Sequence, residues 1–136
     1  MEKVKLHAIK FLSNRERGSR DAVMFDIDDA LIKVSGEPIK EMVTLYKFAE
    51  MIGYHMVIIT ARPYFEKNAI WTAGQLLELG INPINLYFTP AHLKGDAKQE
   101  LDYNFVLSVG DQWTDLTDTI KWIKLPDSDD KRIISN

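Results

Sequence analysis

A short apolar run meets a cluster of acidic residues in the stretch Ala22-Val23-Met24-Phe25-Asp26-Ile27-Asp28-Asp29. An apolar run of this length is typical of a strand that is buried on both faces of a parallel sheet. The aspartates come where such a strand would end. Because ligands bind at the carboxyl ends of the strands in open parallel sheets, this stretch predicts both a fold class and the place of a functional site.

The rest of the chain alternates between helical and strand-like patterns. Apolar residues recur at helical spacing in residues 39–52 and 65–79, and a glycine follows each stretch. Shorter helices are predicted near residues 4–11 and 95–101, and further buried strands at 55–59, 86–88, 105–109 and 122–125. This order predicts an α/β fold, a three-layer α/β/α Rossmann-like domain with a mainly parallel sheet of about five strands.

The chain of 136 residues fits a single domain, residues 1–136. Residues 1–20 are expected to form an N-terminal helix and a polar connector, and residues 127–136 a polar C-terminal tail that is loose at its end. Trp71 and Trp122 are expected in the core or at its edge.

The composition limits the class of protein. Apolar residues make up 46%, charged residues 27%, and the net charge is −3, so no overall basic field indicates nucleic acid. The chain has no cysteine, which excludes disulfides and thiolate metal sites. No signal-peptide core or membrane-spanning run is present, so a cytoplasmic protein without membrane contact is expected. The basic run Arg15–Arg20 is interpreted as a solvated connector, with a phosphate-rich partner as the alternative.

Polar residues with complementary chemistry follow four of the predicted strands. They are Asp26 and Asp28, Thr60, Lys94, and Asp111 with Asp115. Parallel strands bring all of these to one edge of the sheet. Crowded carboxylates repel one another unless a cation lies between them, and oxygen ligands with a phosphate nearby suit Mg²⁺. A lysine and a threonine hydroxyl can then hold phosphoryl oxygens.

These residues carry a resemblance to a known family. Phe25-Asp26-Ile27-Asp28-Asp29-Ala30-Leu31 resembles the first motif, DxDx(T/V), of the haloacid-dehalogenase-like (HAD) phosphatases, and Ile59-Thr60-Ala61-Arg62 resembles the second. Lys94 resembles the third motif, and Val109-Gly110-Asp111-Gln112-Trp113-Thr114-Asp115 the fourth, GDxxxD. The resemblance covers roughly residues 21–126 and is closest to the plant and bacterial acid-phosphatase branch.

The resemblance implies a role for each motif residue. Asp26 would be the nucleophile and Asp28 the general acid and base, with Thr60 and Lys94 clamping the phosphoryl group. Substrate contacts would come from Thr60, Ala61, Arg62 and Lys94. Metal ligands would be Asp26, Asp28 through its backbone carbonyl, Asp111 directly, and Asp115, which would act through a metal-bound water or orient the lysine.

Several simpler interpretations stay open. The acidic cluster could be a solvated turn with helix caps, Thr60 a strand-end residue, and Arg62 a surface charge. Lys98 lies one helical turn after Lys94 and is the other candidate for the phosphate lysine. Ala30 departs from the family pattern, which has threonine or valine there, so slower chemistry or none is an open outcome.

The function predicted is Mg²⁺-dependent hydrolysis of phosphate monoesters through an aspartyl-phosphate. The alternatives are a nucleic-acid 3′-phosphatase, a phosphotransferase, or a non-catalytic phosphate- or protein-binding module. Neither gap where this superfamily inserts a cap, Leu31–Pro38 or Thr60–Lys94, has room for one. A site without a lid favours a phosphorylated substrate that is itself macromolecular, or an oligomer whose neighbouring subunit covers the site.

Overall fold

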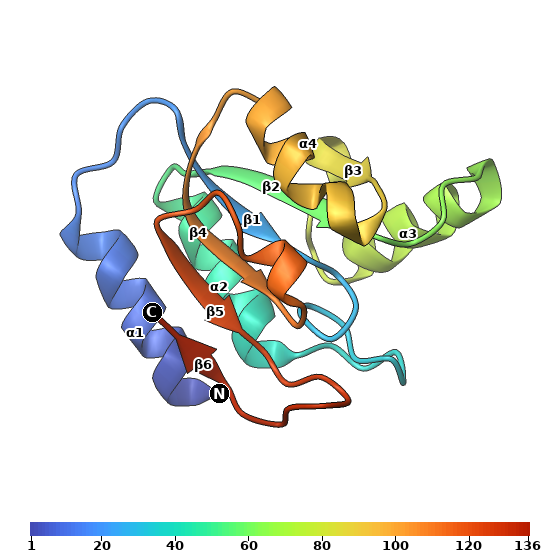
Figure 1. Ribbon diagram of the computed structural model, residues 1–136, viewed down its shortest axis with the longest axis horizontal. Coiled ribbons are helices and arrows are strands. Elements are labelled where there is room, and N and C mark those ends of the chain that lie inside the picture. The colour runs from blue at the N-terminus through green and yellow to red at the C-terminus, as the bar shows by residue number, and fades with distance from the viewer.

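The computed structural model describes residues 1–136 (Figure 1). Its elements follow in the order α1 (Glu2–Asn14), β1 (Asp21–Phe25), α2 (Lys40–Met51), β2 (His55–Thr60), α3 (Glu66–Glu78), η1 (Pro83–Asn85), β3 (Leu86–Phe88), η2 (Ala91–Leu93), α4 (Lys94–Glu100), β4 (Asn104–Gly110), η3 (Trp113–Asp115), β5 (Lys121–Lys124) and β6 (Ile134–Ser135). The predicted alternation of helices and strands is confirmed. No helix combines the length and the apolar character needed to cross a membrane.

The sheet has six strands in the order β3-β2-β1-β4-β5-β6. The first five of these are mutually parallel, and β6 runs antiparallel to β5. The predicted Rossmann-like sheet is therefore confirmed, and β1 lies at its centre. All five parallel strands end at one edge, which brings together the residues that follow them.

The sixth strand was not predicted, and the expected loose end of the tail is wrong. Ile134 and Ser135 pair with Lys124 and Ile123 of β5. Asn136 accepts a hydrogen bond from the backbone N–H of Trp122 (2.8 Å). The side chain of Asn136 thus extends the pairing that a two-residue strand is too short to provide alone.

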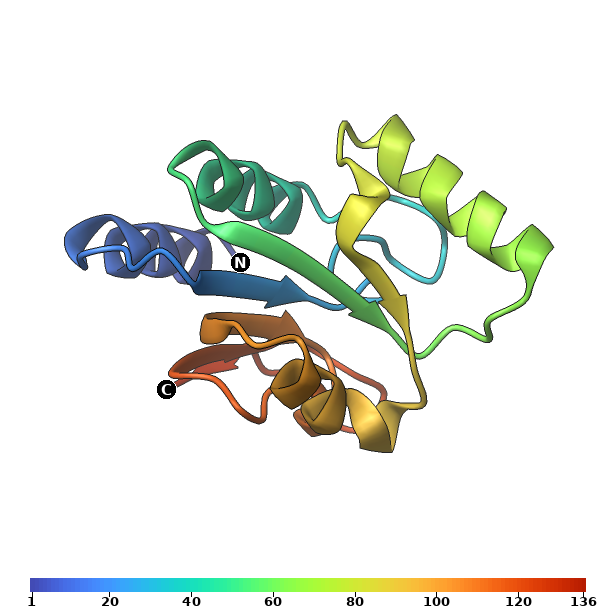
Figure 2. The ribbon, with the colours of Figure 1, turned by 90° about the horizontal axis from the view of Figure 1, so that it is seen from above.

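Helices cover both faces of the sheet (Figure 2). Side chains of β1 alternate between the faces: Val23 and Phe25 belong to the larger core with α1 and α2, whereas Ala22 and Met24 belong to the smaller core. Ala97 and Leu101, from α4 and its C-terminal end, pack against that smaller core. These contacts make the predicted three-layer α/β/α arrangement, and every residue of β1 is buried.

Core elements and loops fill both gaps in which a cap could be inserted. In the first gap, Ile32 bridges Asp28 and Pro38, and α2 begins at Lys40. The second gap holds α3, η1, β3 and η2.

Helix α3 buries only Thr72 and Leu76. The prediction for Trp71 is wrong, because this side chain lies on α3 with 56% of its surface exposed.

Candidate active site

The end of β1 places two aspartates at the active edge. The N–H of Asp26 donates to the carbonyl of Val109 (2.9 Å), so the pairing of β1 with β4 continues to this residue. A tight turn follows, in which Ile27 accepts hydrogen bonds from the N–H groups of Ala30, Leu31 and Ile32. Asp29 takes the left-handed conformation in this turn, at φ 58°. Aspartate tolerates that conformation better than most residues.

Three buried carboxylates form the centre of the site. Asp26, Asp111 and Asp115 each offer one oxygen, and the three oxygens lie within 4.8 Å of one another. Asp111 directly follows β4, and Asp115 lies in η3, where it forms a capping box with Gln112. Oxygen donors at this separation suit a hard divalent cation, so the donor set fits the metal that the sequence predicts. The side chain of Asp28 is not part of this trio.

Gly110 permits the close approach of Asp115. A Cβ atom at position 110 would collide with the Cβ and the carboxylate of Asp115. Gly110 is the last residue of β4, so the side chain of Asp115 packs against the end of this strand. Glycine is therefore required at this position of GDxxxD because a side chain would clash with Asp115. Its backbone has no positive φ angle, so conformational freedom is not the reason.

Lys94 pairs with two of the three carboxylates. Its ammonium donates to Asp26 Oδ1 (2.9 Å) and Asp115 Oδ1 (2.5 Å), and all three residues are buried. Burial acts to lower the pKa of Lys94, but the two carboxylates outweigh it and raise that pKa. Burial, followed by the charge of Asp115, raises the pKa of Asp26 well above its ordinary value despite Lys94. Burial also raises the pKa of Asp111.

Lys98, the other candidate for the phosphate lysine, points elsewhere. It is buried one turn later on α4 and donates to the hydroxyl of Ser108 (3.0 Å) and to the carbonyls of Asp115 (2.7 Å) and Thr117 (2.6 Å). Burial lowers its pKa to about 8. The fold therefore brings Lys94, and not Lys98, to the carboxylate of Asp26.

Asp28 pairs with Arg62 at the open side of the site. Both carboxylate oxygens of Asp28 accept from the guanidinium, at 2.9 Å from Nε and 2.8 Å from Nη2. The side chain of Asp28 is 46% exposed, against 9% for Arg62. The interpretation of Arg62 as a solvent-exposed surface charge is therefore wrong. Its main contact is Asp28, a partner that the sequence analysis did not foresee.

Thr60 and Ala61 directly precede Arg62 at the end of β2. Thr60 is buried at the end of β2, and its hydroxyl accepts from the N–H of Arg62 (3.2 Å). A cavity of about 340 Å³ opens over the site, and Asp26, Asp28, Ala61, Arg62, Lys94 and Asp111 are among its lining residues. Neither Thr60 nor Asp115 lines this cavity, and both side chains are buried.

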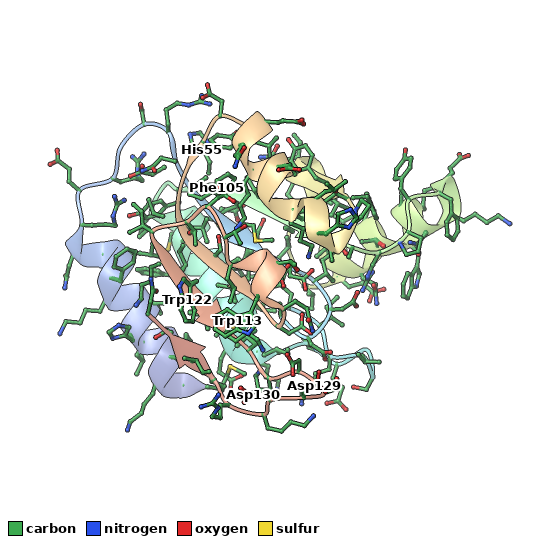
Figure 3. The ribbon with its side chains drawn as sticks, in the orientation of Figure 1. His55, Phe105, Trp113, Trp122, Asp129 and Asp130 are labelled. Atoms are coloured by element: carbon green, nitrogen blue, oxygen red, sulfur yellow. The ribbon has the colours of Figure 1, made fainter.

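Two residues of the fourth motif were missed by the sequence analysis. Gln112 lines the cavity and donates to Asp111 Oδ2 (3.3 Å). Thr114 also lines it, and its hydroxyl is buried without a hydrogen-bond partner. A buried hydroxyl usually has a partner, so a group bound in the cavity would satisfy it. Gln112 and Thr114 lie between the two aspartates of the GDxxxD motif, and this position is the sequence feature that could have indicated a place in the site. Trp113, between them, instead packs outward against Trp122 (Figure 3).

The family comparison agrees with this geometry. The model of the HAD superfamily, subfamily IIIB (acid phosphatase), matches residues 33–130, well over half of the chain. The matched region includes Thr60, Lys94, Asp111 and Asp115, while Asp26 and Asp28 precede it. No curated protein sequence matches the chain. From the family match, together with the convergence of the motif residues at one edge of the sheet, the chain belongs to the HAD superfamily, subfamily IIIB, and is a phosphatase.

Proposed function

We propose that this phosphatase hydrolyses phosphate monoesters with the help of Mg²⁺ through an aspartyl-phosphate on Asp26. The observation that carries the proposal is the environment of Asp26. Its carboxylate lines the cavity, contacts the ammonium of Lys94, and lies within 4.8 Å of two further carboxylates. A nucleophilic carboxylate needs such positive charge beside it to approach an anionic phosphate ester.

The chemistry follows from the two aspartates of the first motif. A carboxylate oxygen of Asp26 attacks phosphorus, and the bond from phosphorus to the ester oxygen breaks. Asp28 gives a proton to the departing alkoxide. Asp28, now ionised, takes a proton from water, and the water oxygen attacks phosphorus. The bond between phosphorus and Asp26 then breaks, which releases inorganic phosphate and restores both carboxyl groups.

The remaining groups hold charge and orientation. Lys94 binds a phosphoryl oxygen as a point charge, while Thr60 supports the loop that carries Arg62. Asp26, Asp111, Asp115 and the backbone carbonyl of Asp28 would hold Mg²⁺, directly or through water. When bound, Mg²⁺ supplies the charge that neutralises the phosphate and the carboxylates.

The substrate is a phosphorylated molecule, and we infer that it is large or that a second subunit completes the site. The cavity of about 340 Å³ is at the small end for a pocket that encloses a whole ligand. No cap domain is inserted in the chain to close over it. We expect a high KM on small esters for the monomer. A low-micromolar KM for a small metabolite, with a monomer shown by light scattering, would contradict this expectation.

The proposal is tested by comparing Asp26→Asn with Asp29→Asn. Hydrolysis of an aryl phosphate should require Mg²⁺ and vanish in Asp26→Asn, because an amide cannot form an acyl phosphate. Asp29→Asn is the matched control: Asp29 does not line the site cavity, and asparagine accepts its positive φ angle. Near wild-type turnover by Asp26→Asn would contradict the mechanism.

A second readout does not depend on turnover. Fluoroberyllate with Mg²⁺ mimics a phosphoryl group on the aspartate and should raise the melting temperature of the wild-type protein and of Asp29→Asn only. No shift in the wild-type protein, with Mg²⁺ binding measured separately, would favour a non-catalytic role.

A further inference from the structure

We propose that α3 sets the position of the general acid and base: Trp71, Thr72 and Gln75 act as positioning residues that hold Arg62, which in turn holds Asp28. This inference rests on the proposed function, because it takes Asp28 to be the acid and base. It assigns a role in the reaction to a helix that carries none of the motif residues and lies at the periphery of the fold (Figure 1).

The hydrogen bonds of Arg62 carry the proposal. Two N–H groups go to Asp28, and Nη1 donates to Thr72 Oγ1 (3.0 Å) and to Gln75 Oε1 (2.6 Å). A guanidinium has five N–H groups, so four are used within the protein and one is left for a substrate oxygen. The geometry therefore fits a clamp on Asp28 better than a main substrate contact.

Trp71 completes the clamp from the solvent side. Its ring centroid lies 5.0 Å from Cζ of Arg62, within cation–π range, although the side chain is 56% exposed. A cation–π contact with an indole attracts the guanidinium and shields it from water. Thr72, Gln75 and Trp71 thus hold Arg62 from α3, while Thr60 holds its backbone from β2.

Asp28 depends on this clamp for a fixed orientation. The protein offers its carboxylate no side-chain partner besides Arg62. A bidentate pair fixes both the position and the plane of a carboxylate. Without it, a side chain that is almost half exposed can rotate into solvent. The hydrogen bonds of Asp26 and Asp115 to Lys94 involve no residue of α3, so the clamp should affect phosphate binding only through the one free N–H of Arg62.

This difference gives a specific kinetic signature. Loosening the clamp should lower kcat for substrates with basic alkoxide leaving groups, which need the proton from Asp28. It should change kcat little for aryl phosphates with good leaving groups. KM should change less than kcat, and by a similar factor for both classes.

The test compares Gln75→Leu with Gln75→Glu and with Glu78→Leu. Gln75→Leu removes the acceptor for Arg62, and kcat for an alkyl phosphate should fall about tenfold, with less than about threefold loss for an aryl phosphate. Gln75→Glu keeps an acceptor and should restore the rate. Glu78→Leu makes a similar change on the same helix at an exposed position without contact to Arg62, and should match the wild type.

Two further measurements separate positioning from a general structural effect. In an Asp28→Asn background, Gln75→Leu should cost nothing more, because both changes act through one group. In a crystal structure of Gln75→Leu, the Asp28 carboxylate should leave its wild-type position. Equal losses for both leaving groups, additive losses with Asp28→Asn, or an unmoved Asp28 would overturn the proposal. Absence of hydrolysis by the wild type would overturn the proposed function, and the crystal structure would still decide the positioning role.

Discussion

The active edge has two halves that are built differently. In the inner half, Asp26, Asp111 and Asp115 lie close together, and the buried ammonium of Lys94 pairs with Asp26 and Asp115. Each carboxylate comes from the end of a strand or the turn after it. In the outer half, Asp28 is 46% exposed, and its partner Arg62 is held by α3. The core of the fold thus fixes the inner half, whereas a peripheral helix fixes the outer half.

This difference matches the demands on each half. In the proposed mechanism, the nucleophile and the metal ligands need fixed positions and low solvent access, which the ends of buried strands provide. The proposed acid and base, Asp28, must meet leaving groups and water, so its side chain has to reach solvent. We expect changes to the inner half to affect stability and all substrates, and changes to the outer half to depend on the substrate.

The largest effect is expected from Lys94→Met. It leaves Asp26 and Asp115 without their shared counterion, and removal of one partner of a buried ion pair typically costs about 3–5 kcal/mol. Without Mg²⁺, the free energy of unfolding should fall by about that amount, and kcat/KM should fall by about a thousandfold for every substrate. Urea denaturation and steady-state kinetics measure both. Lys47→Met, at an exposed position, is the control, and a loss below about 1 kcal/mol would show that the trio does not need Lys94.

Asp28→Asn should have a smaller and selective effect. We expect about a hundredfold loss of kcat for alkyl phosphates and less than about tenfold for aryl phosphates, because a general acid matters most for a basic leaving group. The free energy of unfolding should change by less than about 1 kcal/mol, since the Asp28 side chain is partly exposed. A leaving-group series tests this, and equal losses throughout would reject the acid role.

The increase in melting temperature caused by Mg²⁺ should depend on pH, because Mg²⁺ binds the carboxylates of the inner half. The raised pKa values of Asp26 and Asp111 mean that, without metal, their contribution to stability is present at acid pH and is lost as the pH rises through those values. Mg²⁺ binds the ionised carboxylates, so its stabilising effect should grow over the same range. The melting temperature should rise by about 5–10 °C at pH 8 and less at pH 5.

Matched variants make that comparison specific. Asp111→Asn should remove most of the thermal shift, and Arg62→Met in the outer half should keep it. A shift that is equal at both pH values, or that depends on Arg62, would contradict the division of the site.

The smallest effect is expected from Ala30→Val, which restores one of the two usual residues of the family pattern. Ala30 is fully buried in the larger core and does not line the cavity. Valine adds volume to a packed site, so a loss of about 1 kcal/mol in stability and less than threefold change in kcat are expected. Thermal unfolding and aryl phosphate turnover check this. A rate increase above about tenfold would show that Ala30 limits the chemistry.

The sequence predicts the inner half better than the outer half. Strand ends are visible as apolar runs that stop at Asp26, Thr60 and Asp111, and a parallel sheet brings such ends together whatever the details of packing. The choice between Lys94 and Lys98 depends on the first turn of α4, because both lysines are buried and only their direction differs.

The outer half depends on contacts that no local pattern contains. Arg62 meets Gln75 and Trp71 because α3 turns this side toward the site, and its 3.6-residue periodicity gave no sign of that orientation. The sequence predicts Trp71 in the core or at its edge because tryptophan is a large apolar side chain. In the structure its ring contacts Arg62 and stays largely exposed. Strand β6 has two residues and was missed because a pattern this short carries no periodicity.

The contact between Gly110 and Asp115 has a consequence for how this chain can vary over generations. Since any side chain at position 110 would displace a member of the carboxylate trio, no substitution there leaves the site intact. A codon change at this position should act as a null allele even where the protein still folds and accumulates. Among descendants of this chain, the loss of this one glycine would mark lineages in which the phosphatase activity is no longer under selection.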